Sequence, residues 1–257
     1  MTVILQKSLP YDVSQHRRLP GIQPLKMEDW LLRDEAFAGQ MAYRDRLLAE
    51  KRDKVLALDA AARPAALELL DMVLAAAYPD AGAGDRVTRP DGIEVRLDRD
   101  DPLATLGRLV QEDFCILEKP EGAGEHVLTG AVLCFPASWT LAEKFMHPLL
   151  RIHRTVAPYD DNVGARVQRL FDGVQVGRPL WRFNQIWYMD ADLHAPRLEA
   201  DKRWLKGPEP YFRSERQTMV RLPETRAVAF GIHTYVLEAA DVPDAVERPG
   251  GAAVAAI

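Results

Sequence analysis

The sequence predicts an α+β protein, in which helices pack around an antiparallel β-sheet. Two observations predict this class. Apolar residues with helical spacing occupy the first quarter of the chain, and from about Ile93 onward the pattern changes to short strand-like runs with further helices between them. The chain has 257 residues, of which 47% are hydrophobic, so it is long enough to bury a sizeable core.

The first helical stretch carries an apolar stripe. Trp30, Phe37, Met41 and Leu48 are spaced by seven, four and seven residues, and Val55 extends the stripe. Charged residues fill the remaining surface of this stretch, which is typical of an amphipathic helix. We therefore expect helix here, covering one side of a larger element.

A second helix is predicted to begin near Pro64, because proline suits the first helical turn, where its missing N–H has no intrahelical partner. Its expected apolar face consists of Leu67, Leu70, Leu74 and Ala77. Residues 79–82, which include proline and glycine, are expected to end it.

The middle of the chain predicts a β-hairpin and two short helices. Residues 114–117 and 127–135 are apolar runs on either side of a glycine-containing turn at 120–124, a pattern typical of a hairpin. Residues 139–148 are expected to form a helix with Ser138 or Thr140 as its cap. Residues 163–171 are expected to form another, ended by Gly173.

Three further strands are predicted at residues 181–188, 211–222 and 228–237. The first alternates between an aromatic face and a polar face, and the third places His233 and Tyr235 opposite its apolar face. We expect a single domain over residues 1–240. The tail at 241–257, rich in proline, glycine and alanine, is expected to be flexible.

Composition excludes several classes of protein. Lys and Arg number 33 against 38 Asp and Glu, so the net charge of -5 does not favour a nucleic-acid partner. No apolar run reaches the ~18 residues of a membrane-spanning helix. The apolar start of the chain ends at Gln6, which is too early for a secretion signal, so we expect a soluble cytoplasmic protein. Two cysteines without C-x-x-C spacing argue against a disulfide framework or a cysteine-rich zinc site.

The sequence contains no G-x-S-x-G, Walker A, H-E-x-x-H or strand-linked G-x-G-x-x-G motif. What remains is a set of charged residues on predicted strands. Arg213, Glu215 and Gln217 point to one face, whereas Arg216 points to the other. Such residues form a solvated face, an internal ion pair, or a site for an anionic ligand, since arginine donates two parallel hydrogen bonds to a carboxylate.

Arg182 and Asn184 repeat this pattern on the neighbouring predicted strand, either as a carboxylate site with an orienting amide or as a structural hydrogen-bonded pair. Two histidines are candidates for a ligand role. His153 lies between a predicted helix and a proline-bounded loop, and His233 lies on the polar side of its strand. Each is either a structural residue whose ring is hydrogen-bonded within the protein or a neutral imidazole of the kind that ligates haem iron.

Four stretches in the same order resemble the α-subunit of haem-dependent oxidative N-demethylase. They are residues 30–57, 152–158, 179–184 and 215–223, the last with Glu215, Arg216, Gln217 and Thr218 followed by Arg221, Leu222 and Pro223. The resemblance covers about residues 11–238. Thr155 departs from the family pattern, which has proline at the corresponding position.

This resemblance implies a PAS-like antiparallel sheet that binds b-type haem. It implies a monooxygenase-type reaction in which a small secondary amine is demethylated with O2 and formaldehyde is released. Electrons would come from NADPH through separate subunits that carry flavin and an iron–sulfur cluster. The chain would act without nucleic acid or membrane. The alternative is a haem sensor or carrier of the same fold without catalysis.

The resemblance also assigns roles to the candidate residues. His153 is the first choice for the iron ligand, and His233 is the second. The arginines at 182, 213 and 216 become candidates for binding the haem propionates. The catalytic candidates near the iron are Asn184, Glu215 and Tyr235.

Overall fold

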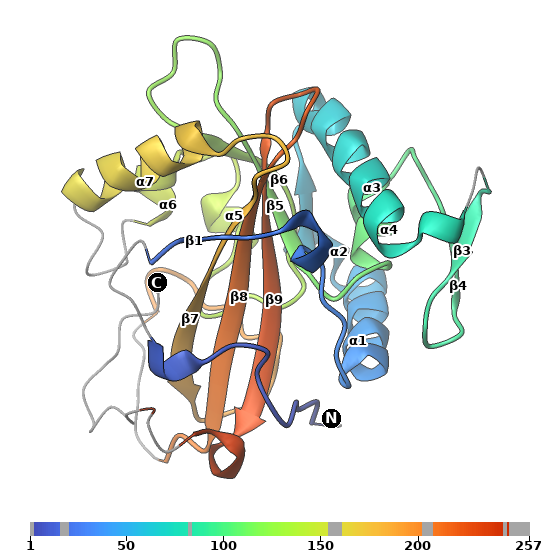
Figure 1. The fold of residues 1–257 in the computed structure, drawn as a ribbon, viewed down its shortest axis with the longest axis vertical. Coiled ribbons are helices and arrows are strands. Elements are labelled where there is room, and N and C mark those ends of the chain that lie inside the picture. The colour runs from blue at the N-terminus through green and yellow to red at the C-terminus, as the bar shows by residue number, and fades with distance from the viewer. Residues whose placement is uncertain are drawn as a thin grey trace.

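The central feature of the computed structural model is an antiparallel sheet (Figure 1). The structure describes residues 3–15, 21–81, 84–153, 161–201, 208–243 and 246. Within these residues, seven strands pair in the spatial order β1 (Gln23–Pro24), β7 (Leu180–Tyr188), β8 (Tyr211–Arg221), β9 (Val228–Glu238), β5 (Asp113–Glu118), β6 (Val127–Val132) and β2 (Leu56–Leu58). The predicted α+β class is confirmed.

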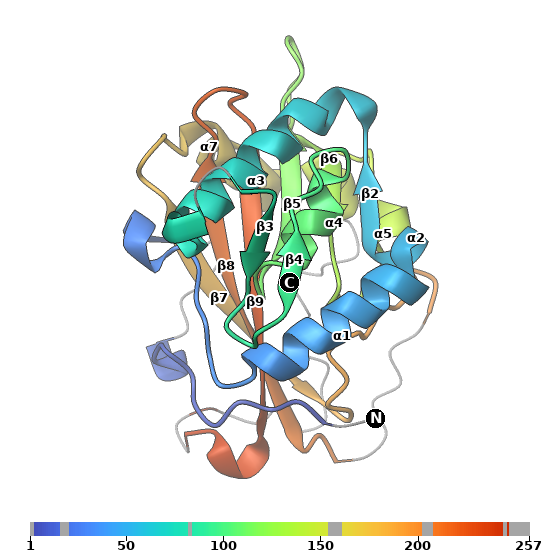
Figure 2. The same ribbon diagram turned by 90° about the vertical axis from the view of Figure 1, so that its right-hand side faces the viewer.

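Helices cover both faces of this sheet. On one face, which we call the α1 face, lie α1 (Phe37–Glu50), α2 (Arg52–Val55), α3 (Arg63–Ala77) and α4 (Pro102–Gly107). A small hairpin of β3 (Arg86–Thr88) and β4 (Glu94–Arg96) packs beside them (Figure 2). The opposite face, the α7 face, carries α5 (Leu141–Lys144), α6 (Leu149–Ile152) and α7 (Asp161–Gly173) (Figure 1).

Strand alternation divides the core between the two faces. On β5, Phe114 and Ile116 point into the α1 face, whereas Cys115 and Leu117 point into the α7 face. Each side chain is at most 5% exposed, so the strand is buried on both sides. The hydrophobic clusters on the two faces therefore hold the sheet between two helical layers.

The three long strands occur where the sequence predicts them. β7, β8 and β9 form a continuous antiparallel ladder, and β5 and β6 form the expected hairpin. The register pairs Asn184 with Glu215, and Glu215 in turn with Thr234. Residues paired in this way point to the same face, so the register decides which candidate residues meet.

The two long helices are confirmed, except that the first begins at Phe37, so that Trp30 lies before it, and that the apolar face of the second differs. Pro64 lies in the first turn of α3 as predicted. Of the apolar face predicted for this helix only Leu70 is fully buried, and the centre of the buried stripe falls on Ala66, Leu69 and Val73. The physical reason is that leucines flank the stripe on both sides, so that the sequence does not define its centre.

The prediction of one continuous helix at residues 139–148 is wrong. Within these residues the single-turn helix α5 forms and Met146 adopts a positive φ of 60°, and a second single turn, α6, begins after Pro148. Pro148 explains the break, because proline lacks an N–H and disfavours helical conformation in the residue before it. Thr140 occupies the N-cap position of α5, but its hydroxyl donates to the Glu143 carboxylate at 2.6 Å.

The shortest elements are not predicted from the sequence, because two or three residues contain no measurable period. They are strands β1 to β4 and the 3₁₀ turns Val13–Gln15, Met27–Asp29, Ala60–Ala62, Pro79–Ala81 and Ala239–Asp241. The predicted flexible tail lies outside the described residues, apart from residues 241–243 and 246. In the part of the chain that is described, no helix is both long and apolar enough to cross a bilayer.

Candidate functional site

The α7 face carries polar side chains from two neighbouring strands. Arg182 and Asn184 of β7 pair with Gln217 and Glu215 of β8, and Arg213 follows on the same face. Asn184, Glu215 and Arg213 are at most 5% exposed. The sheet therefore holds a buried polar group where its neighbours Met219 and Ile232 are apolar core.

Asn184 and Glu215 form a reciprocal pair. The Asn184 amide nitrogen donates to Glu215 Oε2 at 2.8 Å, and the Glu215 backbone N–H donates to Asn184 Oδ1 at 2.9 Å. Gln217 adds a second donor to Glu215 Oε2, at 3.3 Å. These bonds fix the orientation of the Glu215 carboxylate, which is what a side chain that positions a ligand requires.

Arg213 supplies the counter-charge to this carboxylate. Its guanidinium lies 3.4 Å from Glu215 Oε1, and it also donates to the backbone oxygens of Leu193 at 2.9 Å and Phe135 at 2.5 Å. Most of its donors are thus committed to the protein itself. Arg213 acts on the site through Glu215 and through the chain segments that it joins.

Among the cations of the site, Arg182 has the fewest partners to compensate its charge. Burial lowers the pKa of Arg182 to about 10, although the charge of Glu215 opposes this shift. Its Nε atom is buried without a hydrogen-bond partner among the described residues, and one terminal nitrogen makes a long 3.4 Å bond to the Phe183 backbone oxygen. A buried guanidinium in this condition fits an anionic group, and a carboxylate such as a haem propionate satisfies it best.

His153 follows α6 on the same face, and its ring is held in one tautomer. Nδ1 lies 2.9 Å from the Leu149 backbone oxygen, and because a carbonyl only accepts, the proton is on Nδ1 and the lone pair is on Nε2. Burial and, to a smaller extent, the charges of Lys144 and Arg182 lower the pKa of His153 to about 4, although the Leu149 bond opposes this shift. The imidazole is therefore neutral at physiological pH.

These residues make up one site. The charge of Arg182 acts on His153, and the charge of Glu215 acts on Arg182. Among the described residues, no cluster of three or more His, Cys, Asp or Glu side chains could hold a bare metal ion. A single neutral imidazole is enough for haem, because the porphyrin supplies four nitrogen ligands of its own. The arrangement of His153, Arg182 and Glu215 thus fits an anionic metalloporphyrin.

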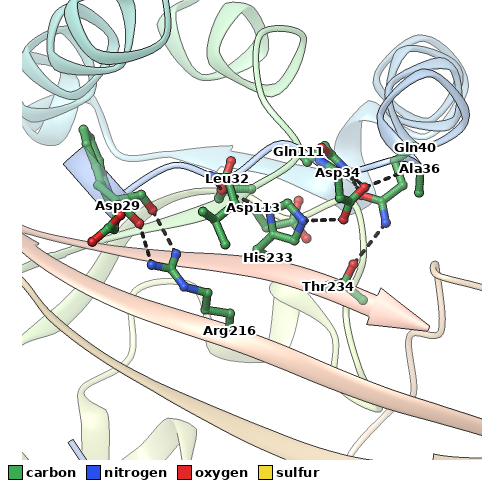
Figure 3. A network of polar contacts seen from close by, with 12 residues as sticks. Asp29, Leu32, Asp34, Ala36, Gln40, Gln111, Asp113, Arg216, His233 and Thr234 are labelled. Atoms are coloured by element: carbon green, nitrogen blue, oxygen red, sulfur yellow. Dashed lines mark hydrogen bonds and ion pairs between the residues drawn. The ribbon is translucent and has the colours of Figure 1, made fainter. Parts of the chain in front are cut away.

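His233 lies on the α1 face, away from His153. Its Nε2 is 3.0 Å from Asp34 Oδ2 and its Nδ1 is 3.0 Å from Glu112 Oε1, as Figure 3 shows for Asp34. Burial alone would lower the pKa of His233, but the charge of Glu112 and the hydrogen bonds of both carboxylates raise it to about 9. Both ring nitrogens carry protons and are bonded, so the second-choice assignment of His233 as an iron ligand does not fit this geometry.

Arg216 is also turned to the α1 face, on the strand next to His233 (Figure 3). Its terminal nitrogens donate to the backbone oxygens of Trp30 at 3.0 Å and Asp29 at 2.5 Å. The guanidinium also lies 5.6 Å from the centre of the Trp181 ring. We therefore assign Arg216 to fastening the segment before α1, in place of the expected propionate contact, because the sheet separates it from His153.

Tyr235 shares the α1 face with His233, on whose ring it stacks at 4.7 Å. It is 2% exposed, and Tyr11 contacts it edge-on at 5.9 Å. The expected role of Tyr235 beside the iron does not fit this position, since the sheet lies between it and Glu215. The eight candidates thus divide into two groups, with five on the α7 face and three on the α1 face.

Sequence reasoning missed two charged residues near His153, namely Lys144 and Glu199. Lys144 Nζ lies 2.6 Å from Glu199 Oε1, and Lys144 is only 4% exposed. The sequence signal for them is weak, because a single lysine or glutamate is typical of a solvated surface. The charged partners of Lys144 and Glu199 lie far away along the chain.

The fold and the site together define an antiparallel sheet protein in which a histidine and an arginine on one face suit an anionic cofactor. The family described as haem-dependent oxidative N-demethylase, alpha subunit-like, matches residues 21–256. This match covers nearly the whole chain, so the protein belongs to that family. The family description implies dependence on haem and, through the term alpha subunit, membership of a multi-subunit enzyme for its namesake.

Proposed function

We propose that this protein is the haem-binding subunit of an oxidative N-demethylase that acts on a small secondary amine. The observation that carries the proposal is the neutral His153 beside an under-compensated Arg182, on the same sheet face as the Glu215 carboxylate. The proposal includes a PAS-like sheet, b-type haem and a cytoplasmic location.

His153 would hold the iron through Nε2. The bond from Nδ1 to the Leu149 oxygen supports this role, because such a bond orients the ring and raises the basicity of the opposite nitrogen. Arg182 would bind a propionate, which supplies the acceptor that its buried Nε requires. Arg213 would hold the carboxylate of Glu215 in place.

Bound haem would supply the redox chemistry that oxidises a methyl group next to nitrogen with O2. Each turnover consumes one O2, two electrons and two protons, and it yields the demethylated amine, formaldehyde and water. The chain has only two cysteines, both buried and free, whereas an iron–sulfur cluster generally takes four ligands. The electrons would therefore come from NADPH through separate flavin and iron–sulfur subunits.

Glu215 would bind the substrate as an alkylammonium ion. A secondary amine is protonated at neutral pH, and a buried carboxylate oriented by Asn184 offers it both a counter-charge and an acceptor. Oxidation next to nitrogen proceeds from the neutral amine, so Glu215 would also accept the N–H proton. Asn184 would position this base without taking part in the proton transfer.

The test is formaldehyde release from dimethylamine by haem-loaded protein, with NADPH and a surrogate flavin and iron–sulfur reductase. Glu215→Gln keeps the shape but removes the charge, and we expect kcat/KM to fall about 10²- to 10⁴-fold. Glu238→Gln, on an exposed carboxylate at the end of β9, is the matched control and should leave the rate unchanged. Haem-loaded wild-type protein that releases no formaldehyde and shows no spectral response to the amine would favour a sensor or carrier.

A further inference from the structure

Lys144, at the end of α5, is a buried lysine that no step of the proposed reaction uses. It is 4% exposed, and its ammonium donates to the Ile152 backbone oxygen and to Glu199 Oε1, both at 2.6 Å. Removing an ammonium from water costs several kcal/mol unless good partners replace the water. The two short bonds supply such partners, and one of them reaches the residue directly before His153.

The peptide group that joins Ile152 to His153 is held at both ends. Its carbonyl accepts the bond from Lys144, and its N–H donates to the Leu149 oxygen at 3.2 Å. The same Leu149 oxygen accepts from His153 Nδ1. Backbone and ring of His153 are thus fixed by Lys144 and Leu149 together.

Glu199 anchors this arrangement to the rest of the molecule. It accepts from Lys144 of α5 and from Arg151 of α6, the latter at 2.9 Å, and its backbone N–H donates to the Glu143 carboxylate. Hydrogen bonds from Arg151 and then Lys144 lower the pKa of Glu199 to about 2, so it is charged at every physiological pH. One carboxylate therefore joins both short helices to the segment after β7.

Such a clamp is needed because α5 and α6 are only four residues long each. A single turn has little stability of its own, and its orientation depends on tertiary contacts. Leu149 anchors α6 in the hydrophobic cluster of the α7 face, but an apolar contact does not fix the direction of the backbone that carries His153. The polar clamp fixes that direction.

We infer that Lys144 and Glu199 form a positioning clamp for His153, which sets the placement and strength of the axial ligand. This inference rests on the proposed haem function. The residues that contact ligand or substrate are others, so Lys144 and Glu199 act only through His153 and its backbone.

The test compares haemin binding and the iron–histidine stretching band of the ferrous protein in wild type and Lys144→Met. Loss of a group that orients a metal ligand typically weakens binding about 10- to 100-fold, and we expect a change of that size together with a shifted band. Glu199→Ala should act in the same direction. Lys119→Met, which removes an exposed lysine paired with Asp172, is the matched control and should leave both readouts at their wild-type values.

Wild-type affinity and an unshifted band in Lys144→Met would overturn the clamp, even if the proposed haem function holds. Circular dichroism checks that each variant is folded. If Lys144→Met does not fold, Glu199→Ala decides in the same way, and unchanged haemin binding in it would overturn the clamp. Failure of the wild type itself to bind haemin would instead remove the proposed function on which the clamp rests.

Discussion

His153 is half-buried and His233 is fully buried, and their surroundings give them opposite protonation states. His153 is bonded through Nδ1 to the Leu149 backbone oxygen and is neutral, whereas His233 lies between Asp34 and Glu112 and is an imidazolium. A neutral imidazole has a lone pair to give to a metal, and an imidazolium has none. Individual side-chain environments therefore separate a ligand from a structural cation.

The raised pKa of His233 predicts that stability depends on pH. Because its folded pKa is about 9 and the ordinary value is 6.5, its contribution is complete below pH 6.5 and is lost as pH rises through 9. We expect the urea midpoint of the wild type to fall between pH 6.5 and 9. In His233→Gln the urea midpoint should be lower than in the wild type at pH 6.5 and should change less between pH 6.5 and 9. An equal change of the midpoint with pH in the two proteins would contradict the assignment of His233 as a buried imidazolium.

A second residue-scale prediction concerns the buried ion pair of Arg44 and Asp113. Their side chains are 0% and 1% exposed and lie 2.6 Å apart, so Arg44→Met leaves a buried carboxylate without its cation. We expect a loss of about 3–5 kcal/mol in the free energy of unfolding, measured by urea denaturation. Arg52→Met, which breaks an exposed pair with Asp101, should cost at most ~1 kcal/mol. Similar losses in the free energy of unfolding in both variants would show that burial does not make the Arg44–Asp113 pair more important to stability.

At the scale of the elements, the close approach of β8, β9 and β5 determines the shape of the sheet. Gly231 of β9 lies where a Cβ atom would come within 2.6 Å of Thr218 Oγ1 and 3.1 Å of the Phe114 ring. Thr218 and Phe114 are its direct partners on the two adjacent strands. The absence of a side chain at this position lets three buried strands pack without distortion.

Gly231→Ala is therefore expected to destabilise the sheet by about 1–3 kcal/mol, as overpacking in a core typically does. Gly124→Ala is the matched control, because no atom lies within 4 Å of a Cβ built there. Thermal and urea unfolding of both variants give the comparison. If Gly231→Ala lowers the free energy of unfolding no more than Gly124→Ala does, the strands separate easily at this point.

Sequence reasoning succeeded for the elements whose period is long enough to measure. The alternation along 181–188 and 228–237 correctly predicted which residues of β7 and β9 share a face. It could not separate His153 from His233, because the carboxylates that bind His233 are 199 and 121 residues away along the chain. Nor could it show that Arg216 is bonded to the oxygens of Asp29 and Trp30, since these contacts arise only from tertiary packing.

At the scale of the whole molecule, the sheet separates two polar networks with different tasks. On the α1 face, His233, Arg216 and their partners fasten the segment before α1 to the strands (Figure 3). On the α7 face, His153, Arg182 and Glu215 form the site proposed to hold haem and amine. The rigid, doubly covered sheet keeps the site residues of β7 and β8 in register while short helices supply the proposed iron ligand.

The most direct test of this account is the ultraviolet–visible spectrum of haemin-loaded protein, before and after reduction with dithionite and addition of carbon monoxide. His153→Ala is compared with His147→Ala, an exposed histidine in the turn before α6. We predict a histidine-type ferrous–CO Soret band in the wild type and in His147→Ala, and its loss in His153→Ala. A wild-type protein that binds no haemin, or a His153→Ala variant with an unchanged spectrum, would contradict the central claim that His153 on the α7 face is the iron ligand.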